Sequence, residues 1–254
     1  MFRKFDYLIV AFSMAITAPC FTANAQGADF RCENKVFAHE KKSPASQGTT
    51  IFQEGVVYDF IDQPQEVIVY DQAVGKLVLL DLTRRIRAEV ATAELETLGA
   101  RAKQVAGASA NAWVRFMASP AFQESFDAAN SELTLSSPWM TYRAKLTSVP
   151  DMAMAHQCRD FLDWCARLQI ALEPGARPPQ ARMALNAAIA KHQAVARQVE
   201  LTYERGGTTV RVRSEHSLVP RLAAKDLADI GTARAAMETF KQVEFAEYRK
   251  GPGR

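Results

Sequence analysis

Three side chains between residues 151 and 172 have the types and the spacing of a metal site. His156, Asp160 and Asp163 fall at positions i, i+4 and i+7, so on a helix they share one face. A histidine with two carboxylates on one face could hold an ion such as zinc. The spacing also fits a ladder of ion pairs, because Arg159 and Arg167 each lie four residues from Asp163. No HExxH spacing accompanies these residues, so we expect neither a metal nor a cofactor.

A second group of reactive residue types lies at residues 214–217. Ser214, Glu215, His216 and Ser217 bring a hydroxyl, a carboxylate and an imidazole together in sequence. The members of a catalytic triad converge from different elements, and the chain contains no G-x-S-x-G elbow. We therefore interpret the segment as the polar end of a strand, and we predict a non-enzymatic protein. The alternative is a secreted hydrolase or metal-dependent enzyme that uses either His216 or the three residues of the metal hypothesis.

Three cysteines follow the first 25 residues. Cys158 and Cys165 are seven residues apart, about 10.5 Å along a helix, which is too far for a disulfide. Cys32 could instead form a disulfide with Cys158 or Cys165 and tie the first strand to this helix. The competing interpretation is that all three are buried free thiols, because cysteine packs well as a small hydrophobe.

The first 25 residues have the pattern of a secretory signal. Arg3 and Lys4 precede an apolar run over residues 7–18, and Ala23 and Ala25 give the small-x-small pattern of a cleavage site. The run is too short to cross a bilayer as a helix. We expect cleavage after Ala25, a single α+β domain over residues 26–254, and a periplasmic or secreted location.

Charge and hydropathy exclude several partners. The chain has 31 Lys and Arg against 28 Asp and Glu, a net charge of +3, whereas nucleic-acid binding usually requires a strongly basic face. After the signal, no apolar run reaches membrane-spanning length. We expect no nucleic-acid partner and no membrane span in the mature chain. For an exported chain of this charge we expect a lipid or an envelope protein as the partner.

Periodicity and turn residues predict strands and helices in alternating blocks. Strands are expected over residues 30–39, 49–61, 66–70, 76–81, 84–90, 132–136 and 139–149. Helices are expected over residues 92–105, 109–117, 151–172, 180–196 and 224–240, the third capped by Asp151. This order predicts an α+β fold: a curved, half-barrel-like antiparallel sheet with helices against one face. Four aspartates should cap backbone at strand ends or turns: Asp59, Asp62, Asp71 and Asp81.

A hairpin near the C-terminus has the best-defined register. Residues 198–205 and 208–215 flank Gly206 and Gly207, a pair that suits a two-residue turn. That turn places Tyr203 opposite Val210 and Leu201 opposite Val212 on an apolar face. It also places Glu200 opposite Arg213 on a charged face, so we expect the hairpin to cover a core on one side.

Aromatic side chains are concentrated on the early strands. Phe52, Tyr58, Phe60 and Tyr70 could line a cavity for an apolar ligand. The alternative is that they fill an ordinary core, as most such residues do.

Residues 49–90 resemble the consecutive strands of outer-membrane lipoprotein carriers of the LolA type. The resemblance lies in TTIFQEGVVYDF, PQEVIVYD and GKLVLLD. It implies an open half-barrel covered by helices, with an apolar interior that holds acyl chains. The chain departs from that family in its extended start at residues 30–39 and in its large helical blocks, 92–117 and 151–196. It also resembles secreted bacterial proteins with a VVYDF…VLLD…RRIR arrangement. We therefore predict an exported envelope protein that binds a lipid or another apolar ligand.

Overall fold

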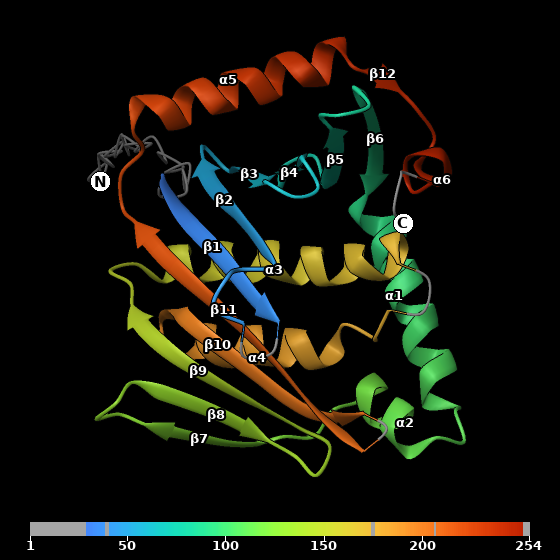
Figure 1. Ribbon diagram of the computed structural model, residues 1–254, viewed down its shortest axis with the longest axis vertical. Coiled ribbons are helices and arrows are strands. Elements are labelled where there is room, and N and C mark those ends of the chain that lie inside the picture. The colour runs from blue at the N-terminus through green and yellow to red at the C-terminus, as the bar shows by residue number, and fades with distance from the viewer. Residues whose placement is uncertain (1–28, 39–40, 174–175, 206, 251–254) are drawn as a thin grey trace, which may run out of the picture.

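The computed structural model describes residues 29–38, 41–173, 176–205 and 207–250. The predicted signal sequence, residues 1–25, lies outside this part of the chain. The described residues form one 12-stranded sheet in the order β12-β6-β5-β4-β3-β2-β1-β11-β10-β9-β8-β7. The pairing is antiparallel except for β12, which runs parallel to β6. The sheet is not closed, so the predicted α+β class with a curved antiparallel sheet is confirmed (Figure 1).

The first strand joins two halves of the sheet that are far apart in sequence. The first half contains β1 (Phe30–Ala38), β2 (Ser46–Gln53), β3 (Val56–Ile61), β4 (Glu66–Asp71), β5 (Lys76–Asp81) and β6 (Ile86–Ala91). The second half contains β7 (Gln123–Asp127), β8 (Glu132–Ser136), β9 (Met140–Ser148), β10 (Ala194–Arg205) and β11 (Thr208–Val219). Because β1 pairs with both β2 and β11, the N-terminal strand lies in the middle of the sheet.

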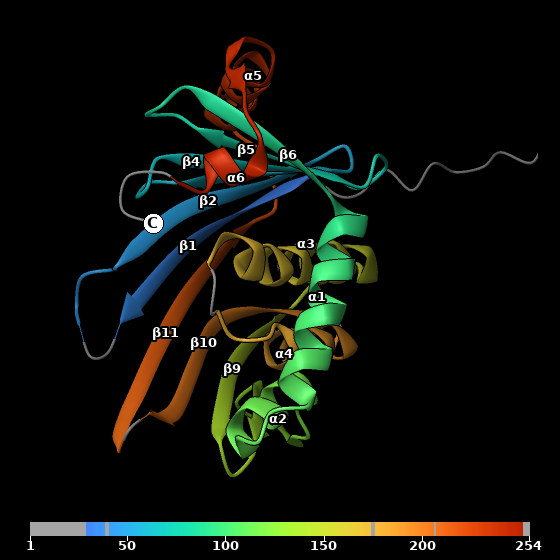
Figure 2. The same cartoon turned by 90° about the vertical axis from the view of Figure 1, so that its right-hand side faces the viewer.

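Helices cover both faces of the sheet. The inner, concave face carries α1 (Thr92–Gly107), α2 (Ala112–Ala118), α3 (Met152–Leu172) and α4 (Gln180–Lys191). Figure 2 shows the sheet curving around α3 and α4. The outer face of β3, β4 and β5 is covered by α5 (Ala224–Thr239), and the chain then continues into β12 (Lys241–Gln242) and α6 (Phe245–Tyr248).

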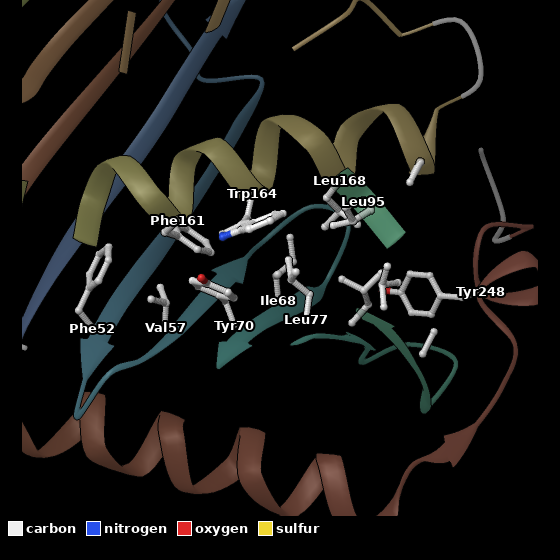
Figure 3. Close-up of a cluster of buried hydrophobic side chains, with 14 of the residues drawn as sticks. Phe52, Val57, Ile68, Tyr70, Leu77, Leu95, Phe161, Trp164, Leu168 and Tyr248 are labelled. Atoms are coloured by element: carbon white, nitrogen blue, oxygen red, sulfur yellow. The ribbon is translucent and has the colours of Figure 1, made fainter. Parts of the chain in front are cut away.

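Alternation along the strands explains why two layers of helices are needed. Tyr70 and Ile68 of β4 face α3, whereas Val67 and Val69 face α5, so every position from Glu66 to Tyr70 is buried. Figure 3 shows the core under α3, where Phe161, Trp164 and Leu168 pack against the sheet. A separate cluster around Leu133, Tyr142 and Leu185 joins α2 and α4 to β8, β9 and β10.

The strand and hairpin predictions are confirmed where local patterning was strong. Tyr203 pairs with Val210, Leu201 with Val212, and Glu200 with Arg213. The Asp151 carboxylate accepts a hydrogen bond from the backbone N–H of Ala153 and caps α3. Asp71 and Asp81 accept hydrogen bonds from the backbone N–H groups of Val74 and Arg84, as expected for aspartates that cap turns.

Three expectations require correction. Residues 49–61, expected as one long strand with a bulge or bend at Gly55, are two strands joined by a tight turn at that position, because Glu54 and Gly55 both adopt positive φ. Helices lie on both faces, because the outward-facing Val67, Val69 and Val78 need the apolar side of α5. The fourth helix ends at Lys191, since the backbone becomes extended at Ala194. The short edge strand β7 was not predicted because every one of its residues is exposed and its pattern carries no period.

Within the described ranges, no helix combines the length and the apolar character needed to cross a membrane.

Candidate functional site

A cavity of about 300 Å³ lies between the concave face of the sheet and the helices α3 and α4. Its sheet wall is formed by β1, β2, β3, β10 and β11. Three of its lining residues, Val36, Gln47 and Arg159, are exposed, so the cavity reaches the surface beside them. Much of its wall is apolar, including Phe52, Phe161, Leu162, Ile189, Ala190 and Val195. This size lies at the lower end of the range for ligand pockets.

The four aromatic residues singled out in the sequence take different positions. Phe52 lines the cavity and packs in the inner core, whereas Phe60 borders the cavity but packs against the outer cluster that contains Tyr58. Tyr58 lies on the opposite face of the sheet, where the Nε of Arg234 donates a hydrogen bond to its hydroxyl. Tyr70 packs in the core near Phe161 and donates its hydroxyl to Asp160 across 2.7 Å. Alternation places Tyr58 and Phe60 on the outer face of β3, because Val57, Asp59 and Ile61 are its residues on the inner face.

A line of hydrogen-bonded polar side chains crosses four neighbouring strands on the inner face. The Ser214 hydroxyl lies 2.9 Å from Nε2 of His216, and Nδ1 of His216 lies 2.8 Å from Oδ1 of Asn34. Asn34 donates to Thr50, and Thr50 donates to Asp59 across 2.6 Å. Because the Asn34 oxygen can only accept, the His216 proton is on Nδ1 and the Ser214 hydroxyl donates to Nε2. Every donor in this line therefore points toward Asp59.

Burial in the cavity wall changes the pKa of both ends of this line. Burial raises the pKa of Asp59 to about 6, against the lowering effect of the hydrogen bond from Thr50. Burial lowers the pKa of His216 to about 4, and the positive charge of Arg182 lowers it further. At neutral pH, His216 is therefore neutral and Asp59 is ionised, with Thr50 as its one side-chain hydrogen-bond donor among the described residues.

The three cysteines converge on the same cavity. Cys32 on β1 and both Cys158 and Cys165 on α3 line it, and all three are free thiols in the structure. Burial raises the pKa of Cys32 and of Cys158 to about 12, and the pKa of Cys165 is also raised well above its usual value. These groups remain protonated thiols at neutral pH, which makes them poor nucleophiles.

Polar side chains on α3 and α4 connect two arginines at the helix wall. Nδ2 of Asn186 donates to Oδ1 of Asp163 across 2.8 Å, and Nε of Arg182 donates to Oδ1 of Asn186 across 3.1 Å. On the other side of Asp163, Nε of Arg159 lies 3.8 Å from its second carboxylate oxygen. Arg159 and Arg182 both line the cavity.

The structure places the three residues of the metal hypothesis in different environments. His156 is exposed, Asp160 accepts the hydrogen bond from Tyr70, and Asp163 accepts the one from Asn186. In the part of the chain that the structure describes, no group of three or more His, Cys, Asp or Glu side chains could hold a metal ion.

Sequence reasoning missed most of the polar cavity residues. Asp59 was assigned to a strand end, but it lies within β3 and faces the cavity, so that prediction was wrong. The available signal was alternation: Asn34 on β1 lies four residues from Phe30, and Thr50 on β2 lies two residues from Phe52, so each shares a strand face with an inward-facing aromatic residue. Arg182 and Asn186 carried no comparable signal, because positions i and i+4 of an alanine-rich helix are often polar and exposed.

The fold and cavity define an α+β protein with an open, curved sheet and an apolar pocket under its helices. No protein-family model and no curated protein matches the chain. The chain is similar in structure to a LolA superfamily protein from Nitrosomonas europaea, at 7% sequence identity and a TM-score of 0.29. The match covers 80% of this chain and 90% of that one.

Proposed function

We propose that this protein is a binding protein or carrier for an apolar ligand, held in the cavity between the sheet and α3 and α4. The observation that carries the proposal is the cavity itself, which is lined largely by apolar side chains and opens to the surface beside Val36, Gln47 and Arg159. Removing an alkyl chain from water into such a site gives about 0.8 kcal/mol per buried CH₂. A volume of about 300 Å³ suits one alkyl chain rather than several.

We also propose that the protein acts outside the cytosol, in the periplasm or as a secreted protein. The support is the basic start, apolar run and Ala-x-Ala pattern of the first 25 residues. Apolar molecules that leave a membrane need a protein that shields them from water, and a sheet with a helical cover provides that shield.

A neutral fluorescent probe tests the binding proposal. N-phenyl-1-naphthylamine should bind the purified protein saturably at one site, with enhanced emission. Ala196 lines the cavity, so Ala196→Phe should fill part of it and weaken binding at least tenfold. Ala235 is exposed on α5, and Ala235→Phe serves as the matched control. Non-saturable binding, or equal binding by both variants when their unfolding midpoints match that of the wild type, contradicts the proposal.

A hydrolase is the second candidate, because one observation favours it. The Ser214 hydroxyl, His216 and Asn34 form a hydrogen-bonded series that resembles a nucleophile, a base and a residue that orients the base. The low pKa of His216 argues against this role, since a general base works best with a pKa near the working pH. If the wild type hydrolyses p-nitrophenyl butyrate and Ser214→Ala does not, the hydrolase activity is established. A wild-type rate no higher than the rate in buffer alone rejects the hydrolase candidate.

A further inference from the structure

We propose that the ligand of the cavity carries an anionic head group, a carboxylate or a phosphate monoester, which binds the guanidinium groups of Arg182 and Arg159. This inference rests on the proposed function, because it identifies the class of apolar ligand as an anionic amphiphile. The relevant part of the cavity is the wall where α3 and α4 meet.

The first argument is that buried polar residues hold Arg182 at the wall. Asn186 is 2% exposed and Asp163 is 7% exposed, and burying such groups requires compensating hydrogen bonds. Asn186 uses its amide nitrogen on Asp163 and its amide oxygen on Nε of Arg182. The connection therefore fixes the direction of the Arg182 side chain rather than leaving it free to extend into solvent.

The second argument concerns the donors that remain. Nε is the one atom of Arg182 with a hydrogen bond to a described residue, so both Nη groups remain available toward the cavity. Arg159 has one ion-pair contact, at 3.8 Å to Asp163, among the residues that the structure describes. Among the described residues that line the cavity, the guanidinium groups of Arg159 and Arg182 outnumber the one carboxylate, that of Asp59, so the lining carries a net positive charge. The planar donor pair of arginine matches a carboxylate or phosphate group.

The third argument is the distribution of charge across the cavity. The sheet wall contains Asp59, ionised at neutral pH, and the neutral His216. An anionic group placed beside Asp59 would be repelled, whereas the same group beside Arg182 would be attracted. Phe52, Phe161 and Ile189 line the same cavity and suit the alkyl chain. The cavity therefore has an apolar part for the chain and a cationic end for the head.

A series of probes with the same alkyl chain tests the inference. Dodecanoate, dodecyl phosphate and dodecanol are each used to displace N-phenyl-1-naphthylamine from the protein at pH 7.5. Dodecanoate and dodecyl phosphate should bind at least 10-fold more tightly than dodecanol, and the difference should shrink with added salt. In Arg182→Gln the anionic probes should lose about 10-fold in affinity while dodecanol is unaffected, and Arg182→Lys should restore part of the loss.

Arg167 provides the matched control, because its guanidinium lies over the Trp164 ring at 4.6 Å and is not among the cavity-lining residues. Arg167→Gln should leave the preference for anionic probes intact. Inorganic phosphate at 10 mM should not displace the naphthylamine probe, since free phosphate lacks the alkyl chain.

Three outcomes overturn the inference. Equal affinity for dodecanoate and dodecanol would reject the anionic head group of the ligand, but it would leave the proposal of an apolar ligand unaffected. Displacement by inorganic phosphate as strong as by dodecyl phosphate would identify a phosphate site without a role for the chain. Failure of every probe, including N-phenyl-1-naphthylamine, would instead reject the proposed function itself.

Discussion

Asn186 of α4 donates its side-chain N–H to Asp163 of α3 across 2.8 Å, at a position where both side chains are buried. This hydrogen bond joins the two helices that form one wall of the cavity. It also links the arginines on either side of it, Arg159 and Arg182. One buried polar pair thus connects the packing of the helical cover to the electrostatics of the site.

Replacing one partner of this hydrogen bond while the other remains should destabilise the protein. Asn186→Leu leaves the Asp163 carboxylate buried without its amide partner, which should lower the free energy of unfolding by about 2–4 kcal/mol. Chemical denaturation of Asn186→Leu, Asp163→Leu and the double variant measures both the loss and the coupling. A double variant that is less stable by the sum of the two single losses would show that the residues do not interact.

Gly48 on β2 should not tolerate a side chain. A Cβ at Gly48 would lie 2.2 Å from the carbonyl oxygen of Phe60 on β3, so the strands would have to move apart. We expect Gly48→Ala to cost about 2 kcal/mol or more, and to weaken probe binding because Gly48 lines the cavity. Gly231 on α5 has nothing within 4 Å of its added Cβ, and Gly231→Ala should stabilise by about 0.5–1 kcal/mol. Equal unfolding midpoints for the two variants would refute the predicted contact.

Asp59 should make stability depend on pH. Its folded-state pKa of about 6 lies above its ordinary value of 3.8, so its contribution to stability is full below pH 3.8 and is lost as the pH rises through 6. Asp59→Asn removes that loss and should be more stable than the wild type at pH 7 by about 1–3 kcal/mol. Urea denaturation at pH 4 and pH 7 should show the gain at the higher pH alone.

His216 should act in the opposite direction over the same range. Its folded-state pKa of about 4 lies below its ordinary value of 6.5. The contribution of His216 to the free energy of unfolding is therefore complete above pH 6.5 and is lost as the pH falls through 4. In the wild type the two slopes partly cancel, and Asp59→Asn exposes the slope of His216. His216→Gln should then remove it. If Asp59→Asn is more stable than the wild type by the same amount at pH 4 and at pH 7, the pKa of Asp59 is not raised in the folded protein.

The cysteines should react slowly in the folded protein. The pKa of Cys32 and that of Cys158 are raised to about 12 by burial, so the fraction of reactive thiolate at pH 7.5 is very small. Iodoacetamide should label Cys32, Cys158 and Cys165 only after unfolding in urea, with three free thiols recovered by peptide mapping without reductant. A peptide in which Cys32 is bonded to Cys158 or Cys165 would instead establish a disulfide across the cavity.

The sequence was informative wherever a pattern repeats over neighbouring residues. The hairpin register of Tyr203 with Val210 followed from one turn and two alternating strands. Contacts between distant parts of the chain could not be predicted from local patterns. β1 pairs with β11, which lies near the other end of the chain. α5 covers the outer face through residues that are typical of any helix rich in small residues. The orientation of Asp59 toward the cavity and the contact between Asn186 and Asp163 depend on such long-range contacts.

Native mass spectrometry of the protein purified from cells expressing the full chain tests the central claim most directly. The proposed function predicts wild-type protein carrying a single bound molecule that organic extraction identifies as a compound with an alkyl chain. Ala196→Phe should carry much less of it, and Ala235→Phe as much as the wild type. Wild-type protein that is free of such a molecule, and that also takes up none of the added naphthylamine probe, would contradict the claim that the cavity is a ligand site.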